Sequence, residues 1–213
     1  MGFILPLFLG FITAAIGISP PGLINMTAAK ISVQDGKIRA MLFAAGALII
    51  IFFQTLLALI FARYIDSHQE VVILLREIGF GIFSVLTLYF LFLAKGPKKS
   101  VKDTLKIKSK KSRFFLGMLI SAINFFPIPY YVFVSVSLAS FGYFSFQISS
   151  IYTFVIGVVF GSFAVFYAYI AFFKKIESKT DFLIQNMNAI IGSVTGLVSI
   201  FSLYNIVRYY FKL

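Results

Sequence analysis

The sequence predicts an all-α integral membrane protein with six transmembrane helices, built as two inverted three-helix repeats whose first and fourth spans are broken at prolines. Hydrophobic residues make up 60% of the 213 residues, charged residues only 12%, and the mean hydropathy is +0.98. This composition leaves too little polar surface for a water-soluble globule. The positions of the charges and of the prolines then predict the individual spans.

Long stretches of the chain contain no Asp, Glu, Lys or Arg, and a helix needs roughly 20 apolar residues to cross a bilayer. The charge-free segments are 1–29, 40–62, 78–94, 114–173 and 182–207. The long fourth segment is expected to fold as two spans. The predicted spans are 3–29, 40–62, 71–94, 114–140, 147–173 and 182–207, with the first and the fourth interrupted.

The basic residues indicate how these spans are oriented. Nine of the nineteen Lys and Arg residues lie between Lys95 and Arg113, and the loops after odd-numbered spans hold fifteen in all. The positive-inside rule therefore places the 95–113 loop in the cytoplasm and both termini outside a cell (inner) membrane. A net charge of +12 suggests nucleic acid in a soluble protein. Beside membrane spans, the same charge indicates anionic lipid headgroups, so we expect a lipid bilayer and no nucleic acid as partner.

Several kinds of chemistry are disfavoured by composition. The chain has no cysteine, which removes thiol redox chemistry and thiolate metal sites, and its one histidine, His68, does not make a metal cluster. We find no group of acids, His or nucleophile with a base that would make an enzyme site. The sequence therefore predicts no enzyme activity, no cofactor and no resident metal.

The two halves of the chain resemble each other, which predicts one transmembrane domain over 1–213, with repeat 1 at about 1–94 and repeat 2 at about 114–213. A shift of 107 positions matches Phe8-Leu9-Gly10 to Phe115-Leu116-Gly117, Ala15-Ile16 to Ala122-Ile123, and Pro20 to Pro127. A shift of 111 matches Gly46 to Gly157, Phe52 to Phe163, and Phe61 to Phe172. Three spans per repeat is an odd number, so the second repeat enters the membrane from the opposite side, as in many transporters.

Proline clusters occupy matching places in the two repeats, Pro20-Pro21-Gly22 in the first and Pro127-Ile128-Pro129 in the second. Proline supplies no N–H and clashes with the preceding turn, so each cluster should interrupt its helix. Broken helices persist in a membrane only where protein or a watery cavity satisfies the backbone. Matching breaks are therefore the best pointer to a substrate site.

The residues around the breaks suggest what such a site would bind. A helix restarting after Pro21 leaves the N–H groups of Gly22, Leu23 and Ile24 without internal acceptors, which suits an anionic group such as a carboxylate. The carbonyls freed before Pro127 suit an ammonium or another donor. The side chains predicted to contribute hydrogen bonds or to reach the site are Asn25, Gln54, Asn124 and Tyr130, together with Pro129 in the second break.

Several motifs together resemble the lysine exporter (LysE) family of amino acid efflux transporters. They are Ser19-Pro20-Pro21-Gly22-Leu23-Ile24-Asn25, Gly36-Lys37-Ile38-Arg39-Ala40, Ala45-Gly46, Phe115-Leu116-Gly117 with Asn124 and Pro127, and Gly157-Val158-Val159-Phe160-Gly161-Ser162. The resemblance implies proton-coupled export of amino acids or similar small metabolites by alternating access. A metal-cation permease of related six-span architecture and a non-transporting membrane scaffold stay open as alternatives.

Two further kinds of residue are predicted to have roles. Many members of that family have Gly-Asp in the second span, where this chain has Ile50-Ile51, so the deepest plausible carboxylate for proton coupling is Glu77. Small residues at Gly46, Gly157 and Gly161 are expected to allow close helix packing, within one chain or in a homo-oligomer.

Overall fold

The computed structural model describes residues 3–94 and 109–211, and the regular secondary structure of these residues is entirely helical. The predicted all-α class is therefore confirmed for this part of the chain. The chain divides into two compact units. Unit 1 comprises Met1–Tyr64 and Thr104–Ser178, and unit 2 comprises Ile65–Asp103 and Lys179–Leu213.

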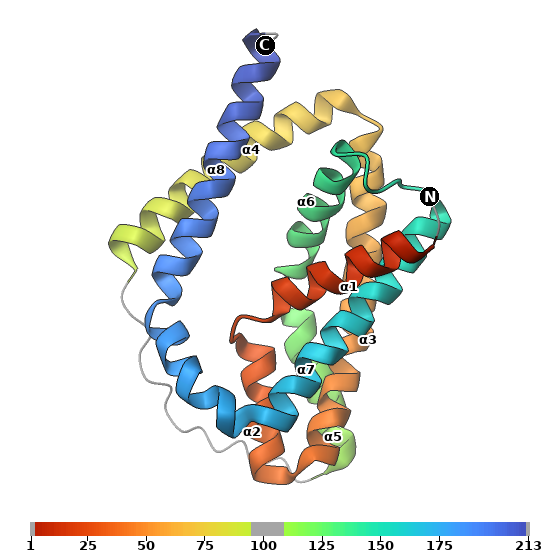
Figure 1. Ribbon diagram of the computed structural model, residues 1–213, viewed down its shortest axis with the longest axis vertical. Helices are drawn as coiled ribbons and strands as arrows, with labels where there is room; N and C mark the ends of the chain where they lie inside the picture. The colour runs from red at the N-terminus through yellow and green to blue at the C-terminus, as the bar shows by residue number, and fades with distance from the viewer. Residues whose placement is uncertain (1–2, 95–108, 212–213) are drawn as a thin grey trace. The chain divides into compact units, whose positions relative to one another are not determined.

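Unit 1 contains two bent helix pairs and two long helices (Figure 1). The helices are α1 (Ile4–Ile18), α2 (Leu23–Asp35), α3 (Lys37–Asp66), α5 (Lys110–Ile123), α6 (Pro127–Ser140) and α7 (Ile148–Gln185), with the ends of α3 and α7 extending into unit 2. The chain bends by 78° between α1 and α2, and by 61° between α5 and α6. The first bend contains Pro20 and Pro21, as the sequence predicts. The second falls just before the predicted cluster, because Pro127 begins α6 and Pro129 lies in its first turn.

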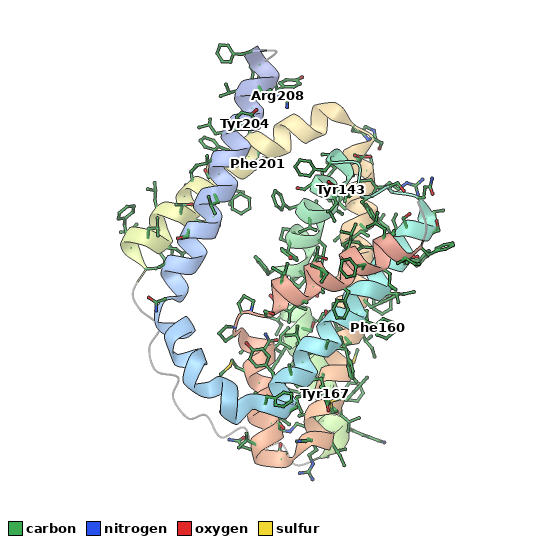
Figure 2. All side chains as sticks on the ribbon, in the orientation of Figure 1. Tyr143, Phe160, Tyr167, Phe201, Tyr204 and Arg208 are labelled. Atoms are coloured by element: carbon green, nitrogen blue, oxygen red, sulfur yellow. The ribbon has the colours of Figure 1, made fainter. Side chains whose placement is uncertain are left out.

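Among the described residues, two helices are long and apolar enough to cross a membrane by themselves, α3 and the Ile148–Phe172 part of α7. The count rises to four if each bent pair is one span. Large apolar side chains are exposed along these helices, including Phe160 and Tyr167 of α7 (Figure 2). Such a surface is compatible with a membrane location, because lipid covers apolar groups that water does not.

Glycines allow the helices of unit 1 to approach one another at the backbone. A Cβ built on Gly10 of α1 would lie 2.2 Å from the carbonyl oxygen of Phe154 in α7. A Cβ on Gly117 of α5 would lie 2.0 Å from the carbonyl oxygen of Phe43 in α3. Since a side chain at either position would overlap the neighbouring backbone, α1 packs on α7 and α5 packs on α3 only because these residues are glycine.

Unit 2 consists of α4 (Gln69–Leu88), the short π-helix η1 (Tyr89–Leu93) and α8 (Met187–Phe211). Hydroxyl pairs join α4 and α8: the oxygens of Ser84 and Ser199 are 2.7 Å apart, and those of Thr87 and Thr195 are 3.0 Å apart. Gly192 allows the side chain of Leu91 to approach α8. Polar side chains thus contribute to the packing of this helix pair.

Helix ends differ from the predicted spans where charged residues follow an apolar run. Lys30 lies inside α2 and Lys37 begins α3, with only Gly36 between the two helices. Likewise, α7 continues to Gln185, past a kink at Phe172. Hydropathy marks where an apolar stretch ends, whereas a helix continues as long as its backbone hydrogen bonds do. Residues 95–108 of the predicted cytoplasmic loop lie outside the described residues.

Candidate functional site

The first break is closed by hydrogen bonds from side chains to the carbonyls that α1 leaves free. The amide nitrogen of Asn25 donates to the carbonyl oxygens of Ile18 and Pro20, the latter at 3.0 Å. The hydroxyl of Tyr169 donates to the carbonyl oxygen of Ser19 at 2.7 Å. Asn25 is buried and lies on α2, immediately beyond the break. The backbone opened by the prolines is therefore satisfied from α2 and from α7.

The start of α2 differs from the end of α1, because no side chain forms a capping hydrogen bond there. Its N-cap residue, Gly22, has extended backbone angles and accepts from the N–H of Met26 at 3.0 Å. Pro21 before it is buried, and Leu23 after it is exposed. The first N–H groups of a helix carry partial positive charge. An anionic group is therefore favoured at this end of α2.

The second break is closed by one side chain of α3. The amide nitrogen of Gln54 donates to the carbonyl oxygen of Ser121 at 3.1 Å and to that of Asn124 at 2.9 Å. Asn124 in turn accepts at its side-chain oxygen from the N–H of Phe126 at 3.4 Å. Pro127 then begins α6 at a position where a missing N–H costs nothing. The carbonyls expected to be free before Pro127 thus have Gln54 as a donor.

Tyr130 connects the regions of the two breaks. It lies in the first turn of α6, one residue beyond Pro129, and its hydroxyl donates to the carbonyl oxygen of Thr13 in α1 at 2.8 Å. Its ring covers Gly17, where a Cβ would lie 2.7 Å from a ring carbon. Since Gly17 is one turn before Pro20, the second half-helix of one pair touches the first half-helix of the other.

Three buried side-chain oxygens of α3 and α5 have no hydrogen-bond partner among the described residues. They are Oε1 of Gln54, Oγ1 of Thr55 and the hydroxyl oxygen of Ser121. A buried polar atom without a partner costs about 1–3 kcal/mol, so native proteins rarely leave one unused. Gln54 joins these two helices at the second break. The region therefore has unused capacity for binding a polar ligand.

The end of α2 carries an ion pair that the sequence reading did not identify. The Arg113 guanidinium, at the start of α5, donates to the carboxylate of Asp35. The Arg113 side chain is only 3% exposed and the Asp35 side chain 19% exposed. The two residues are 78 positions apart, so no local pattern links them. The only signal in the sequence is an acidic residue at the edge of an apolar segment, and this signal does not indicate which basic residue pairs with it.

Glu77, predicted for proton coupling, lies in unit 2 and is half-buried. Its carboxylate accepts a hydrogen bond from the hydroxyl of Tyr210 at 2.7 Å. That hydrogen bond, and secondly the negative charge of Glu77, raise the pKa of Tyr210 above its usual value. The structure thus gives Glu77 a partner near the end of α8, and its role in proton coupling stays a prediction.

The predicted site residues therefore divide between the two units. Both breaks are in unit 1, and Gln54, Asn124 and Tyr130 all make hydrogen bonds there. The glycines predicted for packing, Gly46 and Gly157, are also in unit 1 and face neighbouring backbone, as does Gly161. Tyr169 was not singled out at the outset, because its position relative to the first break depends on the packing of α7. Thr55, like Gln54, is recognisable in the sequence as an uncharged polar residue within a span that could line a cavity or bond across helices.

No model of a known protein family, no curated protein and no solved structure matches this chain. The resemblance to lysine exporters consequently depends on the motifs of the sequence alone.

Proposed function

We propose that this protein is a secondary transporter that exports amino acids or similar small metabolites across the cytoplasmic membrane. In this proposal, its six spans form two inverted three-helix repeats, and the paired helix breaks hold the substrate. The observation that carries the proposal is the pair of proline breaks, each bent by 60° or more, in one compact unit. Helices broken inside a membrane are typical of transporter substrate sites.

The glycine contacts of unit 1 support the inverted repeat. Gly10 meets the carbonyl of Phe154 and the N–H of Val158, while Gly117 meets the carbonyl of Phe43 and the N–H of Ala47. Shifts of 107 and 111 positions, the same shifts that align the repeats in the sequence, turn the first contact into the second. Two repeats related by a twofold axis would exchange contacts in this way.

The second pair of contacts obeys the same relation. Gly46 meets the carbonyl of Phe114, and Gly157 meets the carbonyl of Leu7, again with equivalent positions exchanged. At the crossing of α1 and α7, contact positions advance together, from Gly157 against Leu7 to Gly161 against Phe11. This makes α7 parallel to α1. If the two repeats enter the membrane from opposite sides, the first span of one repeat must run parallel to the second span of the other.

The charges of the two breaks suit a small zwitterion. The uncapped start of α2 favours an anionic group such as a carboxylate. The carbonyl ends of α1 and α5 already accept side-chain hydrogen bonds, but the partial negative charge of a helix end still favours an ammonium nearby. Tyr130 spans the two regions through its bond to Thr13. An amino acid carries both groups, and the resemblance to lysine exporters supports amino acids as substrates and efflux as the direction.

The ion pair indicates which end of unit 1 faces the cytoplasm. Arg113 and Asp35 bring the end of α2 to the start of α5. The basic residues Lys30, Lys37 and Lys111 belong to these same helix ends. Under the positive-inside rule, we propose that this end is cytoplasmic and that both termini lie outside. We also propose coupling to the proton gradient, with Glu77 as the acid. This part of the proposal depends on the sequence alone.

The test compares amino acid accumulation in cells with and without the protein. We expect expression to lower the accumulation of at least one amino acid or analogue, and dissipation of ion gradients to abolish the difference. Replacing Pro20, Pro21 and Pro127 by Ala should remove the export while the protein still inserts in the membrane. The control is Phe160→Leu, on an exposed position of α7, which should export normally. No change across a broad amino acid panel, or normal export by the Ala variant, would refute the proposal.

A further inference from the structure

Three unpartnered oxygens belong to residues of α3 and α5, the two helices that Gln54 joins at the second break. Oε1 of Gln54, Oγ1 of Thr55 and the hydroxyl of Ser121 have no partner among the described residues. Gln54 and Ser121 are in direct contact, because the Gln54 amide nitrogen is 3.1 Å from the Ser121 carbonyl oxygen. Thr55 follows Gln54 on α3, and both Thr55 and Ser121 are fully buried. We refer to Gln54, Thr55 and Ser121 as the polar patch of α3 and α5.

The carbonyl groups at the end of α5 add to the patch. The carbonyls of Ser121 and Asn124 are at the C-terminal end of this helix, where the helix dipole places partial negative charge. Gln54 donates its amide nitrogen to both carbonyls. The reversed amide would bring its oxygen against two carbonyl oxygens, so Oε1 of Gln54 is fixed as an acceptor. The unpartnered atoms of the patch are therefore all oxygens.

The patch contains no charge of its own. Asp35 is the one acid of unit 1 whose side chain the structure describes, and it is paired with Arg113 at the end of α2. Divalent metal ions are commonly held by one or more carboxylates among their oxygen ligands. A neutral set of carbonyl, amide and hydroxyl oxygens instead suits a monovalent cation, and helix ends of broken spans coordinate sodium in other transporters.

We propose that Gln54, Thr55, Ser121 and the carbonyl of Asn124 form a binding site for a sodium ion. This inference rests on the proposed function, and it adds a sodium site in unit 1 to the proton coupling proposed for Glu77 in unit 2. Because the ligands come from α3 and from the end of α5, the bound ion holds the end of α5, where the second break begins, against α3. The substrate's ammonium group has related chemistry and is distinguished by the test.

The test measures the melting temperature of the purified full-length chain in detergent, without amino acids. NaCl is compared with choline chloride at equal ionic strength. A ligand that binds only the folded state raises the melting temperature, so sodium at ten times its dissociation constant should raise it by about 3–6 °C. Choline, which is too large for the patch, should give no rise. Methylammonium chloride is the probe for a substrate ammonium group.

Two site variants each remove one oxygen while nearly preserving volume, Thr55→Val and Ser121→Ala. We expect each to reduce the sodium-dependent rise by at least half. The matched control is Ser162→Ala, which removes a buried hydroxyl from α7 and should keep the full sodium response. Using two conservative site variants keeps the test valid if one of them fails to fold.

Several outcomes would overturn the inference. Equal melting temperatures in NaCl and choline chloride would mean that the patch binds only water. A response to methylammonium but not to sodium would assign the patch to the substrate. An equal rise in KCl, or a sodium response that survives both site variants, would also refute a sodium site here.

The outcomes separate this inference from the proposed function. A sodium-dependent rise without any amino acid export would leave the site standing and refute the exporter. Export without a sodium-dependent rise would refute the site and leave the exporter standing.

Discussion

The two breaks of unit 1 share a backbone plan and differ in the groups that close them. Both occur at prolines, with bends of 78° and 61°. The carbonyls of the first break receive hydrogen bonds from Asn25, in the next helix of the same chain segment, and from Tyr169 of α7. Those of the second break receive them from Gln54 of α3. The first break is thus closed partly by its own helix pair, and the second by a different helix.

This difference shows that proline position and glycine packing can be repeated while the polar groups change. The glycine contacts of the two halves correspond position by position, whereas the counterpart of Gln54 under the 111-residue shift is Val165. A symmetric pair of breaks would offer two identical half-sites. Different donors at the two breaks instead suit a ligand with two unlike ends, as proposed above.

The largest expected effect tests what the two breaks have in common. Gly10→Ala and Gly117→Ala each place a Cβ within about 2 Å of a carbonyl oxygen of the facing helix. Since backbone has to move in both cases, we expect each variant to lose more than about 4 kcal/mol of stability. The measurement is the yield and melting temperature of folded protein in detergent.

The control for these variants is Gly81→Ala in α4, where a Cβ meets nothing within 4 Å. Alanine is better than glycine within a helix by about 0.5–1 kcal/mol, so this variant should be neutral or slightly stabilised. If Gly10→Ala and Gly117→Ala differed widely in their effects, the equivalence of the two crossings would be refuted.

The next effect concerns a feature found in one half only. Asp35→Asn leaves the Arg113 guanidinium buried without its carboxylate. Breaking a buried ion pair from one side costs about 3–5 kcal/mol, and we expect a loss of stability in that range by chemical denaturation. The double variant Asp35→Leu with Arg113→Met should recover most of this loss, because it removes both charges. A double variant as unstable as Asp35→Asn would contradict the explanation.

A smaller effect separates the two closing amides. Asn25→Leu and Gln54→Leu each deprive two carbonyls of a donor. We expect each to cost about 1–3 kcal/mol, the usual cost of leaving a buried polar group unsatisfied. Cleavage by a protease added to the detergent-solubilised protein should increase near the first break for Asn25→Leu and near the second for Gln54→Leu. The same cleavage pattern in both variants would show that the breaks are not closed independently.

The smallest effect concerns the tyrosines. Tyr169→Phe removes the hydrogen bond to the Ser19 carbonyl, and Tyr130→Phe removes the one to Thr13. Each bond should contribute about 0.5–1.5 kcal/mol to stability, measured as a small decrease in melting temperature. The ring of Tyr130 stays packed on Gly17 in the Phe variant, so a much larger loss from Tyr130→Phe would reveal a role for its hydroxyl beyond this one bond.

Features of the fold that depend on nearby residues could be predicted from the sequence. Apolar composition and the absence of charge predicted helices, and proline chemistry predicted both breaks, because a proline acts on its own turn. The ends of the helices were less predictable. The apolar run of the fifth span stops near Phe172, where the backbone kinks, yet helical structure resumes beyond the kink and continues to Gln185. The inversion of the repeats and the roles of the site residues stay predictions.

Contacts between distant residues could not be predicted. Tyr169 is 150 positions from Ser19, and Asp35 is 78 positions from Arg113. Neither pair has a periodic or compositional signal, because their proximity results from how α1, α2, α5 and α7 pack. Gln54 was selected as a polar residue in an apolar span, but nothing in the sequence indicated that it would close the second break.

The glycine crossings also determine the order in which the chain can assemble during synthesis. The contact of Gly117 can form as soon as Gly117 is synthesised, because its partner Phe43 precedes it. The contact of Gly10 cannot form until Phe154 has been synthesised. At ribosomal rates of about 5–20 residues per second, the 144 residues between them take roughly 7–30 s to appear. During that interval α1 has been synthesised, but the part of α7 that it finally packs against has not. The insertion machinery is then the available partner for α1.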